Sequence, residues 1–247
     1  MKKLSLICLI FLGSYYLHSQ CTTDPNDIDF LSKKARLTNF CGDINAYHKT
    51  GWTILMGACS YGKNLNLIDD CLKLKPDIFK LERYDSISDT SNHYMRLNAC
   101  HFITFPSLVE SKGPQDPLKS PDDEIEILKL FVKYFPEDSN RIYTCAFESL
   151  VQHNDYCYNS VFEYLKTRIN INYVDSLGNS FLHMAIRYSR MENAKWLCSL
   201  GADPYRKNNN GLSPIQLMAS RYSGAERKRN IKALLYCSKH SDCSICK

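Results

Sequence analysis

The chain has 247 residues, of which 31 are Lys or Arg and 26 are Asp or Glu, so its formal net charge is +5. A charge this small, with both signs interspersed, argues against proteins that bind nucleic acid through a strongly basic face. The length suffices for one elongated domain.

The N-terminus has the layout of a secretory signal peptide. Two lysines precede the apolar run at residues 4–12, and the chain becomes polar by residues 18–20. The apolar run is too short for a comfortable membrane span. We predict cleavage after Ser19, which makes residues 1–19 a signal peptide and the mature chain an exported protein, periplasmic or secreted, without membrane insertion.

Two alternatives to cleavage remain open. Lipidation of Cys21 requires a small residue immediately before the cysteine, and Gln20 is not one. An uncleaved N-terminal anchor is the other alternative.

The pattern of apolar residues predicts helices along the rest of the chain. A short helix with a polar outer side is expected at residues 26–37, and a second helix is expected to begin after Thr53 and end at Gly62. A long exposed insertion is expected at residues 106–121, which are rich in Pro, Ser, Lys and Asp. The other helices are expected at residues 65–74, 94–103 and 123–134, around 147–151 and 161–165, at 180–186 and 194–201, from Ser213, and up to 235.

A sequence block near the C-terminus occurs nearly twice. Gly178 and Gly211 lie 33 residues apart, and each is followed at the same offset by a matching hexad, SFLHMA at 180–185 and SPIQLM at 213–218. Between the glycines, residues 194–203 end in Gly-Ala-Asp. The block resembles an ankyrin repeat, a helix-turn-helix unit of about 33 residues with a Thr-Pro-Leu-His-x-Ala motif.

The resemblance implies an all-α ankyrin-repeat solenoid of stacked helix-turn-helix units. It would have an N-terminal capping helix and about five repeats, with the long insertion in the second and extra residues, 221–227, between the helices of the fifth. The ankyrin-repeat domain would occupy residues 20–247, with a Cys-rich tail at 237–247. Its repeats would span approximately residues 43–79, 82–138, 140–172, 173–205 and 206–238.

Several residues of the repeated block have clear physical roles. Ser180 and Ser213 can cap helix N-termini, and Pro214 fits the first helical position, where no backbone donor is needed. Gly201 is expected in the left-handed conformation that ends a helix. In the motif that the block resembles, His183 is a structural residue that bonds nearby backbone, and Gln216 has similar bonding capacity in the next block.

Cysteine is abundant. Cys8 lies in the predicted leader, so an odd number of the 12 cysteines remains in the mature chain and at least one is free or paired intermolecularly. We expect Cys59, Cys71 and Cys198 to be buried and reduced, and Cys21 and Cys41 are candidates for a disulfide.

The C-terminal tail offers a second kind of chemistry. Cys237, His240, Cys243 and Cys246 are weak candidates for a zinc site, and disulfide formation is the favoured alternative. We therefore expect no metal or cofactor.

No catalytic constellation is evident. The sequence contains no glycine-rich phosphate loop, no His-Glu-x-x-His and no nucleophile elbow. Cys100 and His101 are neighbours, but adjacency in sequence does not make a nucleophile and base pair. We predict that the chain is not an enzyme.

A recognition surface is the remaining possibility. In ankyrin-repeat proteins, partners contact the hairpin tips and the solvent side of the first helices. We expect another protein, of unknown identity, to bind there, because large aromatic residues and arginine are enriched at binding hot spots. Carried onto this chain, the surface comprises Tyr47, Lys49, Trp52, Tyr61, Val174, Leu177, Asn179, Arg187, Tyr188, Lys207, Asn209, Leu212 and Arg221.

The sequence thus favours an exported, non-enzymatic protein that binds another protein through its concave face, for example as an inhibitor or an immunity-type partner. A competing interpretation for Trp52 and Tyr61 is that they simply cover neighbouring repeats. Two other functions stay open, a metal-binding or redox role of the C-terminal cysteines and a structural role in the cell envelope.

Overall fold

The computed structural model describes residues 23–28, 35–37, 40–62, 64–83, 97–104, 120–153 and 160–240. Within these residues the fold is all-α: there are ten α-helices and two short 3-10 helices, and isolated β-bridges join Tyr47 to Thr53 and Val174 to Ser180. None of the described helices is both long enough and apolar enough to cross a bilayer.

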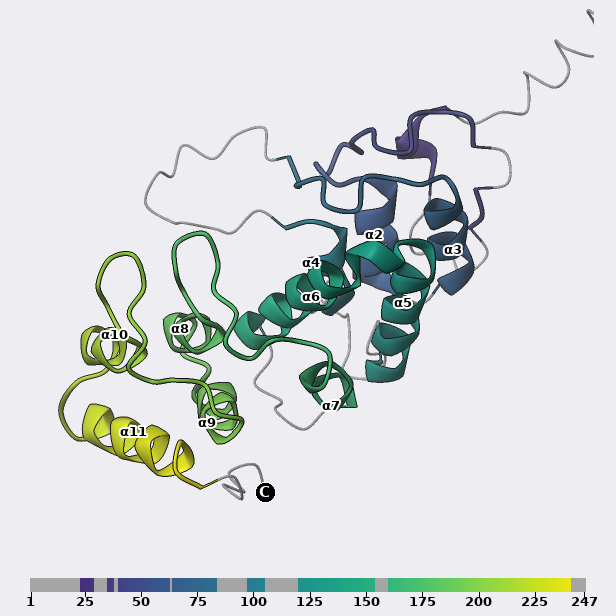
Figure 1. Ribbon diagram of the computed structural model, residues 1–247. Helices are drawn as coiled ribbons and strands as arrows, with labels where there is room; N and C mark the ends of the chain where they lie inside the picture. Colours follow the sequence, from purple (N-terminus) through teal and green to yellow (C-terminus); the bar gives the residue numbers. More distant parts are fainter. Residues whose placement is uncertain are drawn as a thin grey trace, which may run out of the picture.

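The helices form five consecutive pairs (Figure 1). Within each pair the two helices pack together, and the first helix of each pair also contacts the first helix of the next. The second helices form another layer, in which α3 contacts α5, α5 contacts α7, and α9 contacts α11. The pairs are α2 (Ile54–Tyr61) with α3 (Leu65–Lys73), α4 (Ala99–Thr104) with α5 (Pro121–Tyr134), α6 (Ser139–His153) with α7 (Ser160–Lys166), α8 (Phe181–Arg187) with α9 (Met191–Ser199), and α10 (Pro214–Arg221) with α11 (Gly224–Cys237).

The starts of three helices follow from local sequence. Thr53, Ser180 and Ser213 are the N-caps of α2, α8 and α10, and each side-chain oxygen accepts the backbone N–H three residues on. Pro214 occupies the first turn of α10. These caps satisfy donors that helix geometry leaves unpaired, and they agree with the sequence prediction.

Hairpins of the same construction precede α2, α8 and α10. Each turns at a glycine with positive φ: Gly51 at 79°, Gly178 at 76° and Gly211 at 74°. The side chain of the first turn residue accepts the N–H two residues on, as Asp175 does from Leu177 at 2.9 Å. Adjacent tips are also tied together, because Asn209 N donates to the Leu177 carbonyl at 3.0 Å. In Figure 1 the loops before α8 and α10 rise on the same side of the helices.

The hairpin before α4 is enlarged. The backbone N–H of Glu82 donates to the carbonyl of Leu97 at 2.8 Å, whereas the equivalent bonds in the other hairpins join residues four apart. The carboxylate of Glu82 in turn accepts the N–H of Leu97 at 3.0 Å. The sequence did not lead us to expect an insertion at this hairpin.

The third pair has no hairpin. Phe135 and the 3-10 turn Pro136–Asp138 join α5 directly to α6, which begins at Ser139. The helix that follows has 15 residues, against seven in α8 and eight in α10. In this unit, the additional N-terminal residues of α6 therefore replace the β-turn of the other units.

Three sequence expectations differ from the structure. Residues 26–37 are not one helix where they are described, because Pro25–Asp27 is a 3-10 turn and residues 35–37 are not helical. The helix expected at 94–103 is observed as Ala99–Thr104, with residues 97 and 98 outside it. Residues 221–227 do not form a loop, since only two residues separate α10 from α11 and the rest belong to the helices. The insertion expected at 106–121 lies almost wholly outside the described residues.

The core between the central and C-terminal pairs is aromatic. Phe147 of α6 is fully buried and lies 4.7 Å from Phe181 of α8, measured between ring centroids. It also contacts Phe162 of α7 and Trp196 of α9. Edge-to-face packing of this kind adds to the free energy of area burial, so one α6 side chain joins the third and fourth pairs.

Candidate functional site

An open cavity of about 1550 Å³ runs across the first helices of the central and C-terminal pairs. We call it the groove. It is bounded by α4, α6, α8 and α10 and by the backbone that leads from α7 into the hairpin of α8. Its lining residues include His101, Arg141, Cys145, Glu148, Gln152, Arg168, Tyr173, Asp175, Leu177, Met184, Arg187, Tyr188, Asn210, Leu217 and Arg221.

One face of α6 forms the middle of the groove. Arg141, Cys145, Glu148 and Gln152 recur every three or four residues, which puts them on one side of the helix. No hairpin precedes α6 to cover this side. The absence of that β-turn therefore opens the groove at its centre.

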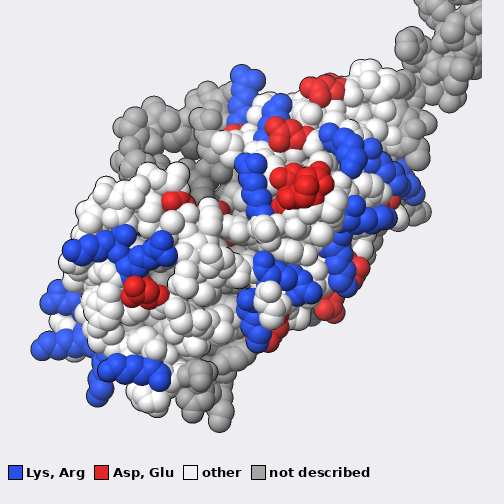
Figure 2. All heavy atoms as spheres, viewed as in Figure 1, with Lys and Arg blue, Asp and Glu red and all other residues white. Residues whose placement is uncertain are grey.

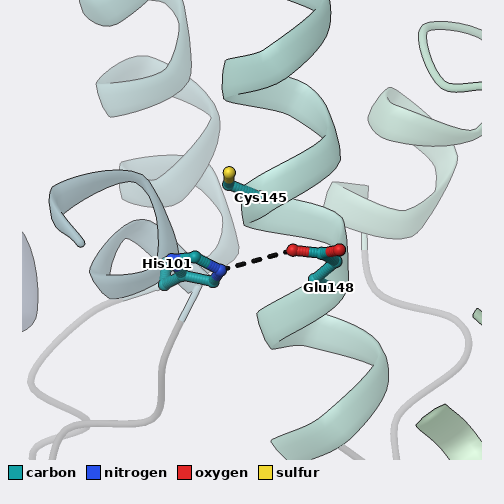
Figure 3. A group of neighbouring side chains, drawn as sticks. All are labelled: His101, Cys145 and Glu148. Carbon is teal, nitrogen blue, oxygen red and sulfur yellow. Dashed lines mark hydrogen bonds and ion pairs between the residues drawn. The ribbon is translucent and has the colours of Figure 1, made fainter. Parts of the chain in front are cut away.

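The base of the groove holds a buried histidine and carboxylate (Figure 3). His101 Nε2 lies 3.4 Å from Glu148 Oε2, and the two side chains are 6% and 9% exposed. His101 Nδ1 accepts the backbone N–H of Asn98 at 3.2 Å. Because Nδ1 accepts, the proton of the neutral ring is on Nε2, and Nε2–H donates to Glu148.

The same backbone bond identifies His101 as a motif residue. His183 Nδ1 accepts the N–H of Ser180 at 3.1 Å, as His101 accepts that of Asn98. Residues 98–103 therefore correspond to the hexad 180–185. The sequence analysis treated His101 only as a neighbour of Cys100, because the hexad of the second unit lacks every other motif residue.

His183 and His101 differ in what their second nitrogen meets. His183 Nε2 bonds the backbone carbonyl of Leu212 at 2.9 Å, just before α10 begins. The structural role predicted for His183 is thus observed. The backbone beside His101 already belongs to α6, so its carbonyls accept hydrogen bonds within the helix and none replaces the carbonyl of Leu212. The carboxylate of Glu148 accepts instead.

His101, Cys145 and Glu148 also offer metal-ligand atoms that lie within 4.8 Å of one another. A metal ion would need the lone pair of His101 Nε2, but the bond from Asn98 keeps the proton on that nitrogen. Burial and the nearby Glu148 carboxylate raise the pKa of the Cys145 thiol to about 11, so the thiolate that a metal prefers is disfavoured. The arrangement fits a hydrogen-bonded support better than a metal centre.

The same geometry does not assemble a nucleophile and base. A cysteine-histidine pair needs one ring nitrogen to face the thiol and the other to face an orienting group. In His101 the backbone of Asn98 takes one nitrogen and Glu148 takes the other. The thiol of Cys100 is fully buried and points to the carbonyl of Ile78, and burial raises its pKa well above the usual value.

Tyr173 also lines the groove and interacts with Glu148. Burial, followed by the charge of Glu148, raises the pKa of Tyr173 to about 12. The phenol therefore stays neutral at ordinary pH. The base of the groove is thus polar and consists of the hydrogen-bonded His101 and Glu148 and the phenol of Tyr173.

The structure brings four of the predicted contact residues together in the groove: Leu177, Arg187, Tyr188 and Arg221. Leu177, at the hairpin tip, is 58% exposed. Lys207, Asn209 and Leu212 lie on the next hairpin and are exposed. The contribution of α6 was missed, because that unit has no hairpin motif from which to identify the solvent side of its predicted helix.

Two predicted residues of the same hairpins support the fold. Asn179 is only 2% exposed, and its amide bonds Asp175 at 3.0 Å and Asn208 at 2.8 Å. Its side chain is therefore not on the surface, which corrects its assignment to the contact set. Val174 is partly buried and pairs with Ser180 in a β-bridge.

The predicted residues of the first unit lie outside the groove. Trp52 packs on Phe102 with 4.8 Å between ring centroids, and its indole N–H donates to Glu82 at 3.2 Å. Tyr47 donates to the carbonyl of Leu81 at 2.8 Å. Both side chains thus pack against the second unit. For Trp52 this agrees with the competing interpretation, in which it covers the neighbouring repeat. Lys49 is exposed at the first hairpin tip, and Tyr61 is partly buried at the end of α2.

The described cysteines fall into two groups. Five are buried and reduced, as expected for the three that we had assigned to the core: Cys59, Cys71, Cys100, Cys145 and Cys198. Cys41 and Cys237 each take part in a disulfide. Cys21 and the tail residues Cys243 and Cys246 lie outside the described residues. His240 is exposed, and its ring stacks on Tyr236 at 4.1 Å.

Comparison with known proteins bears on the C-terminal units. The chain is similar to a solved structure described as the Bd0816 predatory endopeptidase from Bdellovibrio bacteriovorus in complex with immunity protein Bd3460, at 21% identity and a TM-score of 0.44, over 79% of this chain and 86% of that one. We draw no functional conclusion from a similarity at this level. No curated protein matches the chain. Residues 177–209 match the family described as Ankyrin repeat. The chain therefore contains an ankyrin repeat at these residues, as their resemblance predicted.

Proposed function

We propose that this chain is an exported, non-enzymatic protein that binds another protein through the groove and the hairpin tips beside it. The groove is the observation that carries the proposal. It spans four of the five helix pairs and has an exposed leucine at its edge, and ankyrin repeats mediate binding to other proteins.

The proposal includes the organisation of the chain. We take the five helix pairs as five ankyrin repeats that begin after a signal peptide at residues 1–19. In support, an Asp or Asn side chain bonds the N–H two residues on before four of the pairs, in the turns that begin at Asp43, Asp77, Asn170 and Asp203. Only the third pair, which has no hairpin, departs from this pattern.

Binding is tested with two matched double variants. Leu177→Ala/Tyr188→Ala removes apolar surface from the groove, and Tyr205→Ala/Tyr236→Ala removes two exposed aromatic side chains outside it. A partner is first captured from envelope and secreted fractions and identified by mass spectrometry, and its affinity for each variant is then measured with purified proteins.

We expect the groove variant to weaken binding at least tenfold, as loss of hot-spot side chains does, and the control variant to bind as wild type. Circular dichroism checks that both variants are folded. Equal affinity of both variants and wild type would place the binding surface elsewhere.

Export is tested on the mature protein itself. N-terminal sequencing of the chain purified from its native source should begin at Gln20. A chain that begins at Met1 would contradict cleavage.

A further inference from the structure

Four arginines line the groove without a carboxylate partner among the described residues. Arg141, Arg168, Arg187 and Arg221 come from α6, from the turn after α7, from α8 and from α10. Among the described residues none of them forms an ion pair. Positive charge from four separate elements is thus presented to one cavity.

Lysines of the second helices, in contrast, form ion pairs within their own helix. In α3, α5, α7 and α9 a lysine pairs with an acidic residue one turn before it. Such i,i+3 and i,i+4 pairs neutralise charge locally on a helix surface. Local pairing is therefore the rule on the second layer, and the groove arginines depart from it.

The two acidic residues of the groove are engaged within the protein. Asp175 accepts the backbone N–H groups of Leu177 and Asn179 inside the hairpin, at 2.9 and 2.7 Å. Glu148 accepts from His101 and is 7% exposed. Neither carboxylate forms an ion pair with a groove arginine, and the four guanidinium groups outnumber the two carboxylates, so the charge left for a partner is positive.

The arginine side chains are also held in place. The guanidinium of Arg141 lies 3.6 Å above the ring of Phe79, and that of Arg168 lies 3.8 Å above the ring of Tyr164. Arg221 donates to the backbone carbonyl of Arg187, whose own guanidinium reaches Asn179 Oδ1 at 3.5 Å. Holding a side chain before binding reduces the entropy lost on binding.

Building on the proposed function, we infer that the protein segment bound in the groove is acidic and that its carboxylates pair with these arginines. The planar guanidinium group matches a carboxylate with two parallel hydrogen bonds, and such pairs are stronger than neutral ones. Leu177, Met184 and Leu217 add apolar surface to the same cavity, so the segment contacts both charge and hydrocarbon.

The probe is a short fluorescein-labelled peptide of alternating glutamate and leucine, and its matched control has glutamine for each glutamate. Binding to the full mature chain is measured by fluorescence anisotropy. The groove variant is Arg187→Gln/Arg221→Gln. The control variant, Lys228→Gln/Lys232→Gln, changes the charge by the same amount on exposed residues of α11 outside the groove. Figure 2 shows that Lys and Arg gather at the end of the molecule formed by α10 and α11, which makes this control stringent.

We expect the glutamate peptide to bind the wild type about tenfold more tightly than the glutamine peptide does. Its affinity should fall about tenfold for the groove variant and less than twofold for the control variant. Added salt should weaken the glutamate peptide only. Equal affinity for the two peptides, or an equal loss of affinity in both variants, would overturn the inference that the bound segment is acidic.

The affinity of the captured partner separates this inference from the proposed function. A partner that is weakened by Leu177→Ala/Tyr188→Ala but not by Arg187→Gln/Arg221→Gln would keep the groove as the binding site and refute its preference for carboxylates. A partner that is affected by neither variant would refute the groove itself.

Discussion

The third helix pair and the last two pairs hold their neighbours in different ways. Between the fourth and fifth pairs, successive hairpin tips bond to each other through backbone, as Asn209 does to Leu177. The third pair has no hairpin and instead inserts Phe147 among aromatic residues of the third and fourth pairs. The same stacking of helices can thus rest on a row of hydrogen-bonded turns or on side-chain packing, and only the second solution leaves the face of the helix open as a groove.

The largest expected effect tests the aromatic solution. Phe147→Ala should lower the free energy of unfolding by about 3–5 kcal/mol, because it removes a fully buried ring and leaves a cavity. Urea denaturation followed by circular dichroism measures the change. The matched control Tyr205→Ala, at a side chain that is 61% exposed, should cost less than about 0.5 kcal/mol. A loss below about 1 kcal/mol for Phe147→Ala would show that the third pair does not depend on this ring.

The contact between successive hairpin tips is tested by substituting two glycines of equal conformation. Gly178 and Gly211 both have φ near +75°, so alanine at either site costs about 1–2 kcal/mol in backbone strain. A Cβ at Gly178 would also lie 2.9 Å from the backbone nitrogen of Asn209, whereas nothing lies within 4 Å at Gly211. We expect Gly178→Ala to destabilise the protein by about 1–3 kcal/mol more than Gly211→Ala. Equal unfolding midpoints would mean that the tips are not in firm contact.

The motif histidine provides a smaller test. His183→Ala leaves the Ser180 amide and the Leu212 carbonyl without their side-chain partner and should cost about 2–3 kcal/mol. His183→Gln should cost less than about 1 kcal/mol, since Gln216 accepts the N–H of Ser213 in the same way at 2.9 Å. If glutamine were as costly as alanine, the hydrogen bonds would not explain the role of the histidine.

The pH dependence is the smallest effect. Burial lowers the pKa of His183 in the folded protein, so the unfolded chain binds the proton more readily. The contribution of the neutral ring is therefore complete above the unfolded pKa of about 6.5 and is lost as the pH falls through the lowered folded value. Relative to His183→Gln, the wild type should lose stability as the pH falls below about 6.5. Parallel stability curves for the two proteins would rule out titration of His183.

The sequence alone determined the features that depend on neighbours within one turn. The caps at Thr53, Ser180 and Ser213, the left-handed glycine at 201 and the bond from the Ser180 N–H to His183 follow from short-range hydrogen bonding and steric limits. The period of 33 residues, the matching hexads and the Gly-Ala-Asp exit together predicted an ankyrin repeat, which the match at residues 177–209 confirms.

Only the tertiary structure decided what the units present to one another. Trp52 and Asn179 are residue types that occur at binding surfaces, yet neither is available to a partner here. Trp52 packs on Phe102, and Asn179 bonds Asn208. The role of His101 depends on the length of α6, a different segment of the chain, and the groove depends on a turn that is missing there. Such features arise from contacts between residues far apart in sequence, which no local pattern specifies.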